Sequence, residues 1–191
     1  MRKLVLFIHI SLDGFTADSN GSMDWIKVDE EMFDYAGQRT KESDIALYGR
    51  GTFKLMESYW PTAADSPKST KHDIEHSVWY NKVDKILASR TWKEPIPSKT
   101  RVLGDNLVSE IKKLKKQDGK DIIMFGSPTL AQSMIRENLI DDYWLFINPI
   151  LLGRGTTIFK GLESKIMLKL MLNKTFSSGV VCLHFTLKAD N

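Results

Sequence analysis

Short apolar runs alternate along the chain with segments whose apolar residues recur every three or four positions. The runs are rich in Ile, Leu and Val and predict strands over residues 4–10, 44–48, 85–89 and 121–125. The first run is almost continuously apolar, as in a strand that is covered on both faces. The helical spacing predicts helices over residues 29–42, 52–58, 74–82, 106–116 and 127–137. This alternating order predicts a mainly parallel sheet with helices on both faces.

The remaining segments add loops and a late hairpin. Polar residues, glycine and proline predict loops over residues 14–20, 61–71 and 92–100. A short strand is predicted over residues 101–103 and a longer one over residues 142–150. An antiparallel hairpin over residues 175–187, around Ser178-Gly179, makes the sheet mixed. Because we find no internal repeat and no linker long enough to divide the chain, residues 1–191 are predicted to form one α/β domain.

The composition narrows the class of protein without pointing to a partner. The 191 residues are 42% hydrophobic and 27% charged, which is typical of a globular domain with a substantial core. The net charge of +3, from 27 basic and 24 acidic residues, does not indicate a nucleic-acid-binding protein. The basic run at residues 112–116 falls late in a predicted helix, where it complements the helix dipole.

The lone cysteine and the first residues bear on the compartment. Cys182 has no partner for a disulfide within the chain, which favours a reducing cytosol and predicts a buried thiol. The apolar run that contains His9 is too short for a signal peptide and is interpreted as the first strand. No stretch reaches the length of a membrane span, so we expect a cytoplasmic protein with no membrane partner.

Two glycine turns follow predicted strands and begin predicted helices. They are Gly49-Arg50-Gly51-Thr52 and Gly126-Ser127-Pro128-Thr129. Such a turn presents free backbone N–H groups at the positive end of a helix dipole, which is a place to bind phosphate. Each turn alone is equally explained by helix capping, because neither matches the full Gly-x-Gly-x-x-Gly fingerprint. Two of them in one chain indicate a ligand with more than one phosphate, and Arg50 suits a pyrophosphate or a phosphate monoester.

Another strand end carries Ser89-Arg90-Thr91. Two hydroxyls beside a guanidinium suit the ribose 2′-phosphate that distinguishes NADP from NAD. The alternative is a capped turn with a solvated arginine. Ligands of parallel sheets bind outside the carboxyl ends of the strands, where all three of these motifs are predicted to lie.

Carboxylates near the start of the chain are candidates for substrate contact. Ser11-Leu12-Asp13-Gly14 ends the first predicted strand, where Asp13 could relay a proton or orient a substrate. The alternative is an ordinary Asp-Gly turn. Asp24-Trp25 places a second carboxylate beside a flat ring, which could also contact a substrate. The alternative is that Trp25 packs in the hydrophobic core. His72 and His76 are four residues apart but lack the glutamate of a zinc protease motif, so no metal site is predicted.

The order of these motifs resembles a known family. The set comprises Ser11-Leu12-Asp13-Gly14, Gly21-x-x-Asp24-Trp25, Gly49-Arg50-x-Thr52-Phe53, Ser89-Arg90-Thr91, Gly126-Ser127-x-x-Leu130, Leu139-Ile140-Asp141-Asp142 and Pro149-x-Leu151-Leu152-Gly153-x-Gly155. It resembles the reductase domain of bacterial riboflavin biosynthesis and, more closely, the free-standing dihydrofolate-reductase-like relatives of that domain. The resemblance covers nearly the whole chain and implies a dihydrofolate-reductase-like sheet that binds NADPH across its strand ends.

The resemblance also implies roles for individual residues. Phosphate contacts would come from Gly49, Arg50 and Thr52, and contacts to the adenosine 2′-phosphate from Ser89 and Arg90. The pyrophosphate and the nicotinamide would lie against Gly126, Ser127, Pro128, Thr129 and Leu130. Asp13 would be the catalytic residue, in a substrate pocket with Ser11, Asp24, Trp25, Phe53 and Trp60. Many relatives are homodimers, and residues 142–150 and 180–187 are the expected contact strands.

Two departures from the family pattern bear on the substrate. Phe125 stands where the riboflavin reductases usually carry an acidic residue, and Ser127 replaces the second of their paired glycines. In addition, no basic cluster for a ribityl phosphate is identified, and Asp24-Trp25 lacks the Pro-Trp pattern of the dihydrofolate reductases, so neither the ribityl-phosphate substrate nor dihydrofolate is carried over. The sequence predicts an NADPH-dependent reductase of a small heterocyclic substrate, pteridine-like or pyrimidine-like, with a C=N or C=O bond. The alternatives are a non-catalytic protein that binds NADP(H) or another nucleotide, and a structural dimer module whose turns are only helix caps.

Overall fold

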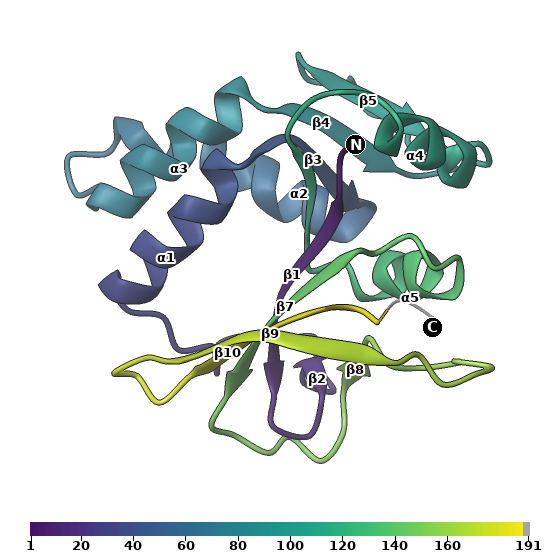
Figure 1. Cartoon of the computed structure of the whole chain (residues 1–191). Helices are drawn as coiled ribbons and strands as arrows, with labels where there is room; N and C mark the ends of the chain where they lie inside the picture. Colours follow the sequence, from purple (N-terminus) through teal and green to yellow (C-terminus); the bar gives the residue numbers. More distant parts are fainter. Residues whose placement is uncertain (189–191) are drawn as a thin grey trace.

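An eight-stranded sheet runs through the computed structural model, which describes residues 1–188 (Figure 1). The strand order is β5-β4-β3-β6-β1-β7-β10-β9. The strands are β1 (Leu4–Ser11), β3 (Ser43–Gly49), β4 (Asp84–Ala88), β5 (Thr100–Leu103), β6 (Asp121–Phe125), β7 (Asp142–Asn148), β9 (Leu168–Thr175) and β10 (Val181–Leu187). The first six are parallel, whereas β10 pairs antiparallel with both β7 and β9. This confirms a single α/β domain with a mainly parallel sheet and a C-terminal antiparallel hairpin. The predicted limits of 1–191 include residues 189–191, which lie outside the described residues.

The central strand β1 is apolar from Leu4 to Ile8 because both of its faces are covered. Its side chains alternate between two core clusters, with Leu4, Leu6 and Ile8 in one and Val5 and Phe7 in the other. β1 lies between β6 and β7, so neither of its edges meets solvent. The prediction of a buried first strand is confirmed.

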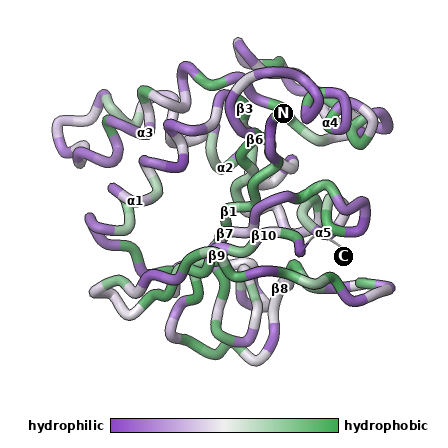
Figure 2. Tube along the Cα trace, in the orientation of Figure 1, coloured by the Kyte–Doolittle hydropathy of each residue, from purple (hydrophilic) through white to green (hydrophobic). Residues whose placement is uncertain are grey.

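Helices cover both faces of the sheet, as predicted. On one face lie α4 (Leu107–Lys115) and α5 (Pro128–Arg136), and on the other α1 (Glu30–Lys41), α2 (Arg50–Tyr59) and α3 (Lys71–Lys82). Figure 2 shows hydrophobic residues concentrated along the central strands and hydrophilic residues along the outer helices. Buried Cys182 packs in the cluster beneath α1 to α3, which confirms a buried thiol. Within residues 1–188, every helix is too short or too polar to cross a membrane.

The segment after α2 differs from its predicted loop. A 3₁₀-helix, η1 (Trp60–Asp65), includes the first five residues of that predicted loop, and Pro61 lies in its first turn, where the missing N–H costs nothing. α3 then begins at Lys71 instead of residue 74, because Thr70 and Asp73 form a capping box. Proline and polar residues, interpreted as loop signals, here mark helix starts.

A small second sheet also replaces predicted loop. β2 (Phe15–Ala17) pairs antiparallel with β8 (Thr156–Thr157). Gly155 permits this approach, because a Cβ at that position would lie 2.1 Å from the carbonyl oxygen of Ala17. The two segments are far apart in the sequence, so no local pattern indicates that they pair.

Candidate functional site

The two glycine turns are in direct contact at the carboxyl ends of neighbouring strands. β3 and β6 pair side by side, so Gly49 and Gly126 end adjacent strands. The backbone N–H of Gly49 donates to Ser127 Oγ at 2.9 Å. β4 lies on the other side of β3, which brings Ser89 to the same edge of the sheet. The structure therefore brings together all three motifs that the sequence suggests for phosphate binding.

A cavity of about 580 Å³, here called the strand-end cleft, follows this edge. It is lined by the starts of α2 and α5 and by the residues that follow β4 and β5. Nine of the ten predicted cofactor residues line it, namely Gly49, Arg50, Thr52, Ser89, Arg90, Ser127, Pro128, Thr129 and Leu130. A cleft of this size, with polar groups at its ends, is of the kind that holds a small cofactor.

The start of α2 offers uncapped backbone donors to the strand-end cleft. Gly49 is the N-cap residue and has no side chain to accept the N–H groups of the first turn. The N–H groups of Arg50, Gly51 and Thr52 therefore lack the helical partners that later residues have. An anion placed here would gain these hydrogen bonds together with the positive end of the helix dipole.

The start of α5 is a sharp backbone reversal. Gly126 and Ser127 both adopt left-handed conformations, with φ of +53° and +57°. Ser127 is the N-cap residue, but its hydroxyl does not cap α5 as a plain capping role would require. It accepts from Gly49 instead and so ties the two helix starts together. A Cβ on Gly126 would meet only Thr52 Oγ1, at 3.9 Å, so the backbone here faces open space.

The far end of the strand-end cleft holds a cation beside a carboxylate. Arg90 Nε lies 2.5 Å from Asp105 Oδ1, and both side chains are largely exposed. Closer to α2, Arg50 Nη1 donates to Thr91 Oγ1 at 3.3 Å. The sequence does not suggest Asp105 as a cofactor residue. Asp105 follows the short strand β5, whereas the acidic residue that binds the ribose in a Rossmann fold is expected after a different strand.

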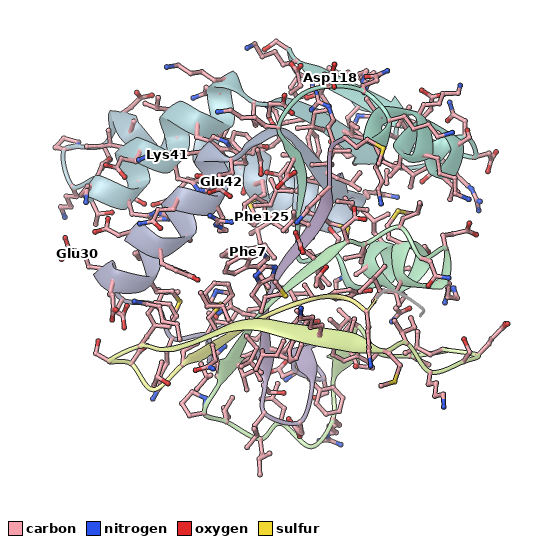
Figure 3. The ribbon with its side chains drawn as sticks, viewed as in Figure 1. Phe7, Glu30, Lys41, Glu42, Asp118 and Phe125 are labelled. Atoms are coloured by element: carbon pink, nitrogen blue, oxygen red, sulfur yellow. The ribbon has the colours of Figure 1, made fainter. Side chains whose placement is uncertain are left out.

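A second cavity, of about 420 Å³ and here called the aromatic cavity, lies between β1, α1, the end of α2 and α3. Its aromatic lining residues are Phe7, His9, Phe33, Trp60, His72, His76 and Phe125. Figure 3 labels Phe7 and Phe125, which lie between α1 and the central strands. Three residues, Thr52, Ser127 and Pro128, line both cavities, so the two adjoin at the glycine turns. Gly126, the tenth predicted cofactor residue, lines the aromatic cavity.

The imidazoles of the aromatic cavity pack against other rings. The ring centroids of His72 and Phe33 are 3.8 Å apart and their planes lie at 11°, which is a stacked pair. His76 lies 4.1 Å from Trp60, and His9 stacks on Phe146 at 4.9 Å. Burial lowers the pKa of His9 to about 4 and that of His76 to about 3. The pKa of His72 is lowered for the same reason, so the cavity holds neutral imidazoles at pH 7.

These neutral histidines predict an acid-labile fold. In the unfolded chain His9 and His76 would bind protons near pH 6.5, but in the folded chain they do so only near pH 4 and below. The free energy of unfolding should therefore fall as the pH drops from 6.5 towards 4, by about 1–2 kcal/mol for each histidine at pH 5. Urea unfolding at pH 7.5 and 5.0 measures the loss, and His9→Gln should make it smaller. An equal loss in that variant would contradict a buried neutral His9.

Among the predicted substrate residues, Trp60 lines the aromatic cavity, whereas Ser11, Asp13, Asp24, Trp25 and Phe53 line neither cavity. Asp24 is exposed, and Trp25 Nε1 donates to the carbonyl of Ser22 at 3.2 Å. Phe53 is buried on the core side of α2, with its ring 5.5 Å from that of Trp92.

Asp13 has a structural set of partners. Its Oδ1 accepts from Ser11 Oγ at 2.6 Å and from the N–H of Leu152 at 3.1 Å, and its Oδ2 accepts from the N–H of Gly153 at 2.7 Å. The Ser11 hydroxyl contributes most to lowering the pKa of this carboxyl. Asp13 thereby joins the end of β1 to the loop after β7, outside the two cavities.

Among the described residues that line the aromatic cavity, Trp60 alone is predicted as a substrate contact by the sequence. The aromatic residues that the sequence does not suggest for this role are Phe7, His9, Phe33, His72, His76 and Phe125. The spacing of His72 and His76 is visible in the sequence, but it predicts neither a metal site nor a wall of rings. Within residues 1–188, no group of three or more His, Cys, Asp or Glu side chains is placed to hold a metal ion. The signal that could have found them is an imidazole on an otherwise apolar segment, as at His9.

The chain is similar to one protein family, to a curated protein and to solved structures. The model of one protein family, described as the RibD C-terminal domain, matches residues 2–182. YyaP, an uncharacterized protein of Bacillus subtilis, is 36% identical over 184 residues, which cover 94% of this chain and 92% of YyaP. Among solved structures, a pyrimidine reductase-like protein of Corynebacterium diphtheriae superposes with a TM-score of 0.70 at 15% sequence identity. The match covers 99% of this chain and 93% of the Corynebacterium chain. Dihydrofolate reductase of Enterococcus faecalis, solved with NADP(H), has a TM-score of 0.65 at 10% sequence identity. That match covers 98% of this chain and 97% of the reductase chain.

Proposed function

This chain belongs to the RibD C-terminal domain family, and from that premise we propose that it is an NADPH-dependent reductase of a small heterocyclic substrate. The family membership confirms the resemblance that the motifs carry. The observation that supports the proposal best is that the strand-end cleft and the aromatic cavity adjoin at Thr52, Ser127 and Pro128. One extended ligand can therefore have phosphates in the cleft and a reactive ring at the edge of the cavity.

The residues of the strand-end cleft fit the chemistry of NADPH. The uncapped N–H groups of Arg50, Gly51 and Thr52 suit a pyrophosphate, and Ser89 with Arg90 suits a 2′-phosphate. At the glycine turn, the backbone of Gly126 faces open space and leaves room for a flat ring. When bound, NADPH supplies the hydride that, with one proton, reduces a C=N or C=O bond.

The aromatic cavity would hold the substrate against that ring. Its apolar walls exclude water, and Trp60 with Phe33 would orient a planar molecule. His9 and His76 lie in these walls as neutral imidazoles, so each would donate or accept a hydrogen bond to the ring, and the proton that the reduced atom needs would come from water. Asp13, predicted as the catalytic residue, already uses both of its oxygens to hold the loop after β7. A protein that only binds a nucleotide would have no use for this cavity.

A thermal-shift comparison of NADPH, NADH and FMN tests the cofactor. NADPH at about 100 times its Kd should raise the free energy of unfolding by about 2.7 kcal/mol. For a chain of this size that corresponds to a rise in Tm of roughly 5–11 °C. No shift with NADPH and none with NADH would overturn the proposal.

Arg90 and Asp105 should act in opposite directions on cofactor choice. Arg90→Ala should lower the preference for NADPH over NADH by about 10–100-fold, the contribution of a hydrogen bond to a charged group. Asp105→Asn should raise that preference a few-fold, because it removes a carboxylate that pairs with Arg90 and would repel the 2′-phosphate. Isothermal titration with both dinucleotides measures the ratio. An unchanged ratio in Arg90→Ala would exclude Arg90 from 2′-phosphate binding.

We propose that the protein forms a homodimer through β9. The predicted contact strands β7 and β10 are each paired on both edges, so their edges are not available. Edge strand β9 exposes Leu170, Met171 and Leu172 instead. Sedimentation velocity should show a dimer for the unmodified chain and a monomer for Leu170→Lys. A monomer at micromolar concentration without the substitution would contradict this interface.

A further inference from the structure

We infer that the substrate of the aromatic cavity is an uncharged, planar and largely apolar ring system that places neither a phosphate nor a carboxylate in the cavity. The inference names the substrate class of the proposed reductase and rests on that function for the site. It follows from what lines the cavity, what forms its rim and where the neighbouring cations are held.

Among residues 1–188, those that line the aromatic cavity include no Asp, Glu, Lys or Arg. Its few hydroxyls are mostly committed to the protein, since Thr16 Oγ1 donates to the carbonyl of Thr156 and Thr40 Oγ1 to that of Gly37. The Ser127 hydroxyl accepts from Gly49. What remains for a ligand is one or two imidazoles and the hydroxyls of Thr52 and Thr156. This suffices for one or two polar atoms on a ring, and it does not suffice for an anion.

The rim of the cavity is apolar even at exposed positions, where a charged side chain would have no desolvation penalty. Met23, Val28 and Leu55 line the cavity and are 43%, 46% and 51% exposed. At such positions a lysine or arginine would remain hydrated and could reach a phosphate or carboxylate on the substrate. Three apolar side chains stand there instead, so the entrance is complementary to an apolar molecule.

Four lysines, Lys27, Lys41, Lys54 and Lys71, are next to lining residues in the sequence, and none of the four lines the cavity. Lys54 precedes Leu55 but pairs with Glu94, and Lys71 precedes His72 but pairs with Asp34 at 2.7 Å. Lys27 lies between two lining residues and is exposed, but it does not line the cavity. Lys27 is thus a nearby cation that a charged substrate could recruit, and the experiment below includes it.

The flatness of the substrate follows from the arrangement of rings. The parallel pair of Phe33 and His72 and the nearby Trp60 offer ring faces within one cavity. Ring faces stack best on another planar π-system. The cavity volume of about 420 Å³ leaves room for one or two fused rings beside a nicotinamide.

Three matched pairs of probes test the inference on the protein with NADPH bound. The neutral members are indole, quinoline and quinoxaline, and each is compared with its 2-carboxylate. At least one neutral probe should quench the tryptophan fluorescence with a saturable curve, and its carboxylate should bind at least about 100-fold more weakly, because the cavity leaves a carboxylate unpaired. Trp60→Phe should remove most of the quenching and leave the stacking surface.

A rim substitution separates charge from shape. Met23→Lys introduces a cation at an exposed position, so folding should be unaffected. It should tighten the binding of the carboxylate about tenfold or more and leave that of the neutral probe unchanged. Lys27→Ala should change neither. Measured affinities in that pattern would support an uncharged substrate.

The outcomes that overturn the inference differ from those that overturn the reductase. Absence of NADPH binding removes the proposed function, whatever the probes do. If NADPH binds but no neutral probe does, or if the carboxylates bind as tightly as the neutral members, the substrate class is wrong. Carboxylate binding that Lys27→Ala abolishes would show that a charged substrate is held at the rim and would also overturn the inference.

Discussion

Replacing Phe53 with alanine is expected to lower the free energy of unfolding by about 3–5 kcal/mol. For a chain of this length that is a fall in Tm of roughly 6–20 °C. The side chain is only 1% exposed, and its ring packs against Tyr48 and Trp92 in the cluster beneath α1 to α3. Truncation would leave a cavity in a core that cannot close around it. Thermal and urea unfolding measure the loss, and the affinity for NADPH should not change.

Leu55 provides the matched control on the same helix. It is 51% exposed and lines the aromatic cavity, so Leu55→Ala should change the free energy of unfolding by less than about 0.5 kcal/mol. The family resemblance makes Phe53 a wall of the substrate pocket, whereas its burial makes it part of the core. If Phe53→Ala left stability intact and raised only the KM for substrate, the resemblance would be right and the core role wrong.

Gly126→Val is expected to weaken NADPH binding by about 100-fold or more, the largest effect that a single side chain should have on the cofactor. The residue has a φ of +53°, which a β-branched residue adopts at a cost of about 1–2 kcal/mol. Its side chain would project towards Thr52, at the point where the strand-end cleft meets the aromatic cavity. Isothermal titration with NADPH measures the loss.

Gly153→Val is a control that distinguishes backbone strain from obstruction of the cofactor by the new side chain. Gly153 has a φ of +73°, a Cβ added to it would have no atom of the described chain within 4 Å, and it lines neither cavity. The substitution should lower stability by a similar amount and leave NADPH affinity unchanged. If Gly126→Val folds and binds NADPH as tightly as Gly153→Val does, then no part of the cofactor passes this turn.

Most of the strands and helices, and the strand-end cleft, could be predicted because their signals are local. Each glycine turn directly follows a strand in the sequence. Arg50 lies within the first of these turns, and Arg90 directly follows Ser89 at the end of another strand. The direct contact between Gly49 and Ser127 could not be predicted in the same way. It depends on β6 pairing beside β3, a choice that is made by the whole sheet and not by either segment.

The aromatic cavity was largely beyond prediction for a different reason. Phe53 and Trp60 are both aromatic and lie within a few residues of each other, yet one is core and the other lines the cavity. Phe53 lies on α2 and Trp60 lies just beyond its end, in η1, so tertiary packing decides their surroundings and residue type alone cannot separate them. The same holds for His72 and His76, whose spacing suits a metal site as well as a wall of rings.

The two cavities draw on different stretches of chain. Nine residues of the aromatic cavity come from the segment between β1 and β3, namely Thr16, Ala17, Met23, Ile26, Val28, Met32, Phe33, Ala36 and Thr40, and none of these lines the strand-end cleft. For the proposed reductase, substitutions in that one segment would alter the choice of substrate without touching the residues that would hold NADPH. A fold arranged in this way would acquire new substrates by exchanging residues 16–40 while its proposed cofactor stays the same.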